Sequence, residues 1–142
     1  MKTSATLRNR IRPQLELLES RVNPDYSLSA ILSNGNLSIN DILDTYNNLS
    51  LSVSGSDLVI SDASQQFTSA PAGGTLSNGD QTLSIPLSLL TGSIAFNTGG
   101  GNDTFSIQAL PEIAGSLTIG SLSNPAGGVA FNGALNLGAR VS

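Results

Sequence analysis

Pairs of apolar residues two positions apart recur along this chain at intervals in the low twenties, which restricts the folds available to it. The first series starts at Leu37, Leu58, Leu83, Phe105 and Val129, at intervals of 21, 25, 22 and 24 residues. The second series starts at Leu51, Ile94 and Leu117. Alternation with a period of two indicates strands with one buried face. A repeat of this length suits one coil of a parallel β-helix, because each coil buries its inner face by stacking on the next.

We therefore expect an all-β domain over residues 24–142, built as a parallel β-helix or β-solenoid. Echoes in the sequence support a repeat: Gly92-Ser93-Ile94 resembles Gly115-Ser116-Leu117, and Ile94-Ala95-Phe96-Asn97 resembles Val129-Ala130-Phe131-Asn132. We also expect Asn97 and Asn132 to stack between coils. Nothing after Arg140 looks like a cap, so we expect either a longer native protein or self-association through an uncapped solenoid edge.

Two turn signals leave an alternative fold open. Asn34-Gly35 and Ser54-Gly55 each separate two alternating apolar runs, and Asn-Gly in this position is a strong signal for a hairpin. These segments are either hairpins or corners of a coil. An antiparallel β-sandwich, with strands every ~8 to 12 residues, is the alternative to the solenoid.

Residues 1–23 have a different character from the rest of the chain. Apolar residues recur there at helical spacing, at Leu7, Ile11, Leu15, Leu18 and Val22. This stripe predicts a short amphipathic helix over residues 13–22, which Asn23-Pro24 ends. The first 21 residues carry five basic and two acidic side chains, a charge of +3, whereas the remainder carries one basic and eight acidic side chains. The segment lacks the apolar run of an ordinary signal peptide, and no stretch of the chain has the length and apolarity of a transmembrane segment.

The sequence Leu15-Glu16-Leu17-Leu18-Glu19-Ser20-Arg21, preceded by a basic stretch, resembles the N-terminal Leu-Glu-x-Leu-Glu-x-Arg motif of planctomycete extracellular proteins. The matching positions are Leu15, Glu16, Leu18, Glu19 and Arg21. This resemblance implies an extracellular or cell-surface location, with residues 1–23 as an export or anchor-like segment. It implies nothing about an activity.

Composition excludes several kinds of chemistry. The chain contains no cysteine and no histidine, which removes disulfides, thiolate nucleophiles, the usual zinc sites and the common proton carrier near neutral pH. The net charge of −4, with a single basic residue after Arg21, argues against a nucleic-acid partner. Carboxylate, lysine and hydroxyl chemistry remain.

A glycine-rich turn over residues 98–103 is the one motif with a specific ligand. Gly99, Gly101, Asp103 and Phe105 match the Gly-Gly-x-Gly-x-Asp-x-apolar pattern of RTX (hemolysin-type) β-solenoid repeats, with Thr98 in place of the first glycine. The resemblance implies a Ca²⁺ site at Gly99, Gly101 and Asp103, because carbonyl and carboxylate oxygens are hard ligands. The alternative is a corner in which the glycines permit a tight turn and Asp103 binds backbone amides, without metal.

We expect from these features a non-enzymatic extracellular or cell-surface protein with a structural or adhesive role, stabilised by calcium and facing a polysaccharide or cell-envelope partner. The alternative function is a carbohydrate-active β-helix domain that binds or cleaves polysaccharide. Asp41 with Asp44, and Asp57 with Asp62, are its candidate carboxylate pairs. The scarcity of basic and aromatic residues after residue 22 favours the non-enzymatic function.

Overall fold

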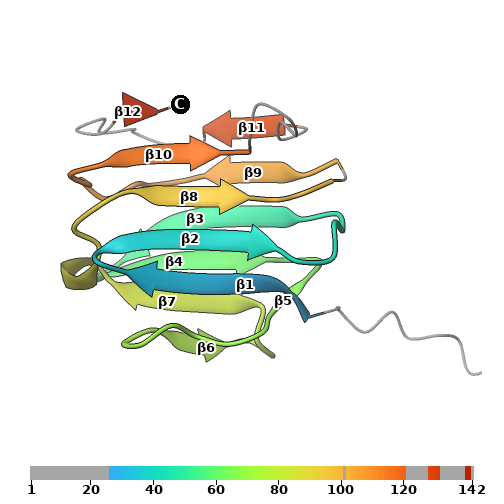
Figure 1. Ribbon diagram of the computed structural model, residues 1–142, viewed down its shortest axis with the longest axis horizontal. Coiled ribbons are helices and arrows are strands. Elements are labelled where there is room, and N and C mark those ends of the chain that lie inside the picture. The colour runs from blue at the N-terminus through green and yellow to red at the C-terminus, as the bar shows by residue number, and fades with distance from the viewer. Residues whose placement is uncertain (1–25, 101, 121–127, 132–139, 142) are drawn as a thin grey trace, which may run out of the picture.

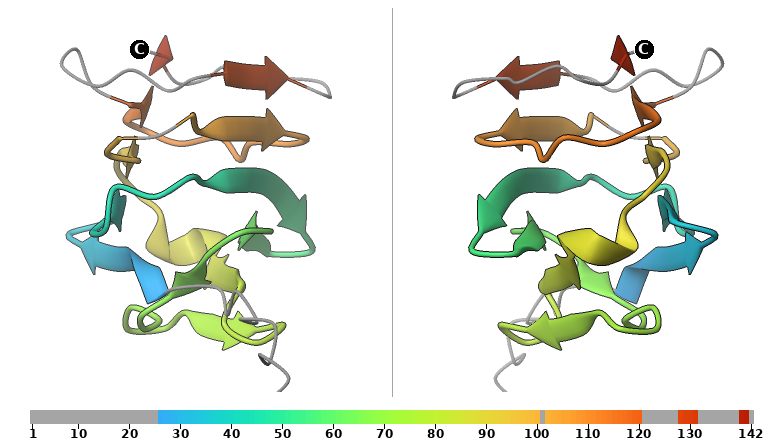
Figure 2. Two further views of the ribbon diagram at one scale, coloured as in Figure 1. Left: turned by 90° about the vertical axis from the view of Figure 1, so that its right-hand side faces the viewer. Right: turned by 90° about the vertical axis from the view of Figure 1, so that its left-hand side faces the viewer.

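Two β-sheets of six strands each lie face to face, and the chain passes repeatedly from one to the other (Figures 1 and 2). The computed structural model describes residues 26–100, 102–120, 128–131 and 140–141, with side chains for residues 26–100 and 102–120. The first sheet has the order β12-β10-β8-β2-β1-β5 and the second the order β11-β9-β3-β4-β7-β6. The elements are β1 (Tyr26–Ser33), β2 (Asn36–Asp41), β3 (Asn48–Ser54), β4 (Asp57–Asp62), β5 (Gln66–Phe67), β6 (Thr75–Ser77), β7 (Thr82–Pro86), the 3₁₀ turn η1 (Leu87–Leu89), β8 (Ile94–Asn97), β9 (Thr104–Ile107), β10 (Ser116–Ile119), β11 (Gly128–Phe131) and β12 (Arg140–Val141).

Most strand pairs within residues 26–86 are antiparallel hairpins, where we expected the first coils of a β-helix, whereas β1 and β5 pair in parallel. β1 pairs with β2 across the Asn34-Gly35 turn, whose φ angles of 49° and 77° are the left-handed values that asparagine and glycine tolerate. β3 pairs with β4 across a turn at Gly55, and β4 and β6 both pair with β7. Both predicted turn signals are therefore hairpins. The expectation of parallel coils is wrong for β4, β6 and β7, which pair in antiparallel fashion.

The strands after residue 86 pair in parallel. β8 lies between β2 and β10, with Ile94 opposite both Leu37 and Leu117. β9 lies between β3 and β11, with Phe105 opposite both Leu49 and Val129. Both sheets are thus mixed, and a wholly antiparallel sandwich is excluded for the strands that the structure describes.

The sheet assignments correct two sequence expectations. Leu37 and Phe105, which we placed in one series, lie in different sheets. The similar segments that start at Ile94 and Val129 also lie in different sheets. The similar segments Gly92-Ser93 and Gly115-Ser116 do stack on each other, since Gly115 N donates to Gly92 O. Asn97 Nδ2 donates to Asn40 Oδ1 at 2.8 Å, so Asn97 does stack on a neighbouring strand. Asn132 lies outside the described residues.

The core lies between the two sheets and consists of the inward-facing side chains of both. It is almost entirely aliphatic; Phe96 and Phe105, one from each sheet, meet edge to face with ring centroids 5.5 Å apart. Its fully buried large side chains are Phe67, Phe96, Phe105, Leu28, Leu37, Ile39, Leu49, Leu51, Leu58, Ile60, Leu83 and Ile85. Each such side chain contributes about 1.5–3 kcal/mol relative to exposure.

The expected helix over residues 13–22, and with it the whole 1–23 segment, lies outside the described residues. Among the residues that are described, no helix is long and apolar enough to cross a membrane.

Candidate functional site

The glycine-rich turn after β8 lies directly on the connection between β2 and β3. Asp103 is buried, with 1% of its surface exposed, and its Oδ1 accepts hydrogen bonds from Asn47 N at 3.1 Å and Asn47 Nδ2 at 3.3 Å. Thr104 N donates in return to Asn47 O at 2.9 Å. The Asp103 carboxylate therefore joins one connection to the next, as in the metal-free alternative.

The glycines of this turn bring its backbone close to Asp44. Gly99 has a φ of +65°, and a Cβ at that position would collide with Asp44 Oδ1. The next residue, Gly100, donates its N–H to the same Asp44 oxygen at 3.0 Å. Gly101, the remaining residue of the expected calcium site, lies outside the described residues.

Asp103 is one of several polar residues that extend the inward-facing alternation of a strand by one step beyond its apolar residues. Asp41 and Asp62 each lie two residues after an inward apolar pair, and so does Thr98, whereas Asn47 and Asp103 each lie two residues before an inward residue. The parallel and antiparallel registers bring all of them to one end of the sheets. We call this set the polar end layer: Asp41, Asn47, Asp62, Thr98 and Asp103.

Backbone amides and one asparagine satisfy the carboxylates of the polar end layer. Asp41 accepts from Leu43 N at 2.9 Å, Thr45 N at 2.8 Å and Asn47 Nδ2 at 2.7 Å. Asp62 Oδ1 accepts from Ser64 N at 2.6 Å and Gln65 N at 3.0 Å, and both its oxygens lie within reach of Asn48 N. These acids therefore fix the loops that follow or precede the strands.

The surroundings of the Asp62 carboxylate shift its pKa. Burial raises the pKa of Asp62 above its usual value, and the negative charge of Asp41 adds to the rise. Hydrogen bonds from the backbone of Ser64, Asn48 and Gln65 oppose it. The balance keeps the pKa of Asp62 raised, because desolvation penalises its charged form more than the amides stabilise it.

Gly99 and Asp103, the described residues of the expected calcium site, do not belong to a cluster of three or more acidic side chains. Among the described residues, no group of three or more histidine, cysteine, aspartate or glutamate side chains lies close enough to hold a metal ion. Calcium takes ~6–8 oxygen ligands, and Asp103 Oδ1 already carries two N–H donors. Asn47 Oδ1 and Thr98 Oγ1 are buried and have no partner among the described residues. The Asp41 carboxylate lies near that of Asp103, since both accept from Asn47 Nδ2, but Asp41 also accepts from Leu43 N and Thr45 N. The described residues therefore fit calcium poorly.

One of the two candidate carboxylate pairs for glycoside hydrolysis, Asp57 with Asp62, fails on geometry. Asp57 and Asp62 begin and end the same six-residue strand, which separates them by about 17 Å at ~3.3 Å per residue. Hydrolytic pairs lie ~5–9.5 Å apart. Asp41 has both oxygens engaged, and Asp44 Oδ1 is bound to Gly100 N.

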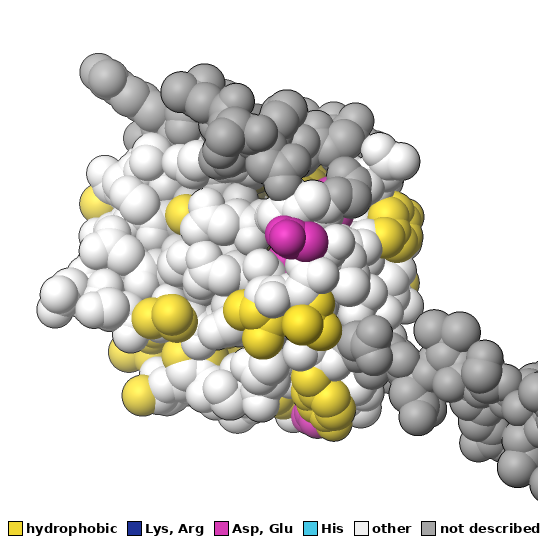
Figure 3. Space-filling model, turned by 45° about the vertical axis from the view of Figure 1, so that its right-hand side comes forward, with side chains coloured by type: hydrophobic (Ala, Val, Ile, Leu, Met, Phe, Trp, Pro, Cys, Tyr) yellow, Lys and Arg dark blue, Asp and Glu magenta, His cyan; other side chains and the backbone are white. Residues whose placement is uncertain are grey.

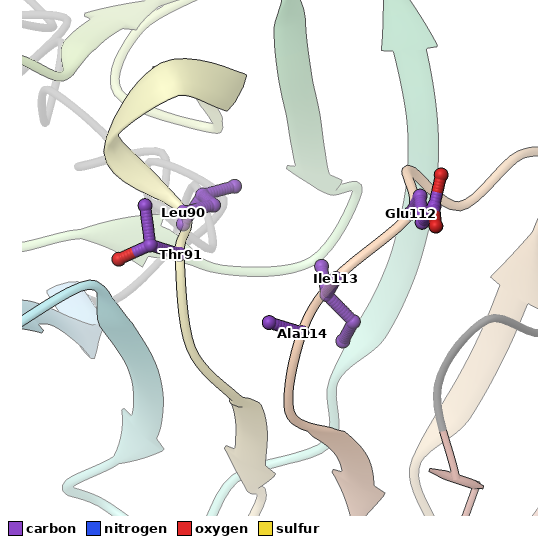
Figure 4. Close-up of a pocket in the computed structure, with 5 residues that line it drawn as sticks. All are labelled: Leu90, Thr91, Glu112, Ile113 and Ala114. Atoms are coloured by element: carbon purple, nitrogen blue, oxygen red, sulfur yellow. The ribbon is translucent and has the colours of Figure 1, made fainter.

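A shallow pocket of about 430 Å³ lies at the other end of the sheets, between the β9–β10 connection and the segment after η1 (Figure 4). Leu90 and Thr91 line it from one segment, and Glu112, Ile113 and Ala114 from the other. Glu112 is its only titratable side chain, so the pocket holds no acid–base pair.

No protein-family model matches this chain, and comparison with curated proteins and with solved structures found no significant match.

Sequence reasoning missed Asn47 and Asp62 as organising residues. Their signal is the phase of the alternation. Asn47 lies two residues before the inward Leu49, and Asp62 lies two residues after the inward Ile60, so both fall on the inward side. A polar residue in the inward phase at a strand end predicts a buried polar contact.

Proposed function

We propose that this chain is a non-enzymatic structural or adhesive protein of the cell surface or extracellular space. In this proposal, two-strand coils stack as a β-solenoid, and the hairpins over residues 57–86 are an insertion between its first two coils. The observation that carries the proposal is the similar offset of the later parallel partners: Ile94 pairs with Leu117, 23 positions later, and Phe105 with Val129, 24 positions later.

The engagement of the carboxylates supports a structural role. In the polar end layer, Asp41, Asp62 and Asp103 hold backbone or asparagine N–H groups in one geometry. A carboxylate that catalyses or binds a ligand needs free oxygens directed at its substrate. Calcium is not required by this arrangement, and calcium stabilisation stays a prediction of the RTX-like resemblance.

The location rests on the Leu15–Arg21 motif and is tested in cells. We expect the tagged full chain, produced in its native cells, to be found in the envelope or medium and to be cleaved by protease added to intact cells. Glu16→Ala with Glu19→Ala and Arg21→Ala, within the motif, is expected to keep the chain inside. The matched control Thr3→Ala, Ser4→Ala and Ser20→Ala is expected to leave its location unchanged. Wild-type chain retained in the cytosol would refute the proposal.

A further inference from the structure

An exposed apolar surface lies beside the polar end layer, where the described chain begins. Tyr26, Ile42, Leu43 and Tyr46 are 51%, 55%, 54% and 46% exposed. We call these four residues the apolar corner. Ile42 N donates to Ser27 O at 2.8 Å, which holds the β2–β3 connection against the start of β1. Figure 1 shows both segments at the same side of the molecule, and Figure 3 shows hydrophobic side chains gathered near acidic ones on this side.

Acidic residues border the apolar corner without a basic partner among the described side chains. Asp44 follows Leu43 in the same exposed connection, and Asp80 Oδ2 accepts a hydrogen bond from Tyr26 Oη at 3.1 Å. Arg140 is the only lysine or arginine in the described part of the chain. The surface therefore combines apolar side chains with uncompensated negative charge.

We propose that the apolar corner is the docking site for the chain's own N-terminal segment, residues 7–22. That segment has the complementary chemistry: an apolar stripe at helical spacing, from Leu7 to Val22, and an excess of arginine. Charge complementarity and apolar burial then act together at one surface.

The connection is short enough to make docking effectively intramolecular. Three residues separate Val22 from Tyr26, and four steps of extended chain reach at most about 14 Å. A tether of this length gives an effective concentration on the order of millimolar, so even weak complementarity is sufficient for occupancy.

The two tyrosines of the chain make the proposal directly testable, because both belong to the apolar corner. Tyr46 is the better reporter, since the hydrogen bond to Asp80 and the charge of Asp80 raise the pKa of Tyr26. The experiment is acetylation of tyrosine by N-acetylimidazole in the purified full chain, followed by peptide mass spectrometry at Tyr46.

The test variant Leu15→Asp with Leu18→Asp interrupts the apolar stripe. The control variant Asn9→Asp with Ser20→Asp adds the same charge at positions that helical spacing places opposite the stripe. We expect the stripe variant to acetylate at least about threefold faster than wild type, because only the undocked form reacts. The control pair is expected to stay within about twofold of wild type, since it leaves the stripe intact.

A second pair of variants tests the surface itself. Leu43→Asp is expected to raise the rate at Tyr46 as the stripe variant does. Ile31→Asp, at a residue equally exposed but on the outer face of β1 further along the sheet, is expected to leave it unchanged. Equal rates in wild type, the stripe variant and Leu43→Asp would overturn the proposal. Protection that increases with protein concentration would overturn it in favour of a second copy. Either result leaves the proposed location and structural role standing.

Discussion

The Asp103 carboxylate illustrates how a residue with the spacing of a metal ligand serves a structural contact. Among the described residues, its two hydrogen bonds come from Asn47, a residue 56 positions earlier that is itself completely buried. Replacing Asp103 by alanine leaves Asn47 N without an acceptor in a buried place. We expect Asp103→Ala to lower the free energy of unfolding by about 1–3 kcal/mol, measured by urea denaturation.

Asp103→Asn is the matched variant, since its amide oxygen still accepts from Asn47 N, and we expect it to lose less stability than the alanine variant. We expect both losses to be the same in calcium and in chelator. A wild-type stabilisation by calcium that disappears in Asp103→Ala would instead support the RTX-like site.

Asp62 predicts a pH dependence of opposite sign to that of an ordinary surface carboxylate. Because its pKa is raised in the folded state, the folded protein holds a proton at Asp62 over a pH window in which the unfolded chain has lost it. Stability from this group therefore increases as the pH falls through the raised pKa toward the usual value of 3.8. We expect wild type to gain stability relative to Asp62→Asn between about pH 7 and about pH 4, in paired urea titrations. A difference that is flat or opposite in sign would show that the amide hydrogen bonds outweigh burial.

At the scale of elements, the turn between β8 and β9 depends on having no side chain at Gly99. Alanine there combines an unfavourable φ of +65° with a collision against Asp44. Gly55, in the β3–β4 hairpin, has a similar φ of +60° but no neighbour within 4 Å of its Cβ position. We expect Gly55→Ala to cost about 1 kcal/mol from the backbone alone, and Gly99→Ala to cost clearly more. Thermal unfolding of the two variants checks this, and equal losses would mean that Asp44 moves aside freely.

Elements with local signals were predictable from the sequence, and elements fixed by distant contacts were not. Asn34-Gly35 specifies a hairpin by its own backbone preferences, and the structure forms one there. The pairing of Leu37 with Ile94 joins residues 57 positions apart and depends on which sheet each strand enters. Apolar alternation reports a buried face but not the sheet that contains it, so the two series were mixed. The Asn78-Gly79-Asp80 turn closes the β6–β7 hairpin.

In the candidate site too, features with local signals were predictable, and contacts between distant residues were not. Local spacing singled out Gly99 and Asp103, and the structure places both in a tight corner. The partner of Asp103 is Asn47, which no local pattern connects to it. The stacking of connections from successive strands determines this contact, so the sequence alone left the metal-bound and metal-free alternatives open.

For the whole molecule, parallel stacking in one half and hairpins in the other predict uneven cooperativity. Leu117 is fully buried in β10, which pairs only with β8 and β12. We expect Leu117→Ala to cost about 2–5 kcal/mol. In native-state hydrogen exchange we expect amides of β8, β9 and β10 to lose protection first, while those of β4 and β7 retain it, because repeat units depend on their neighbours. Equal loss in every strand would mean that both halves unfold as one unit.

The two ends of the sheets differ in how well they tolerate inserted sequence. At the polar end layer, hydrogen bonds between successive connections fix the length and path of each loop. At the opposite end, the Gly55 turn projects into open space. Exposed hairpin tips are where insertions are tolerated. Longer loops, foreign epitopes or whole appended modules are therefore best displayed at Gly55, where the scaffold can acquire new sequence without disturbing its stacking.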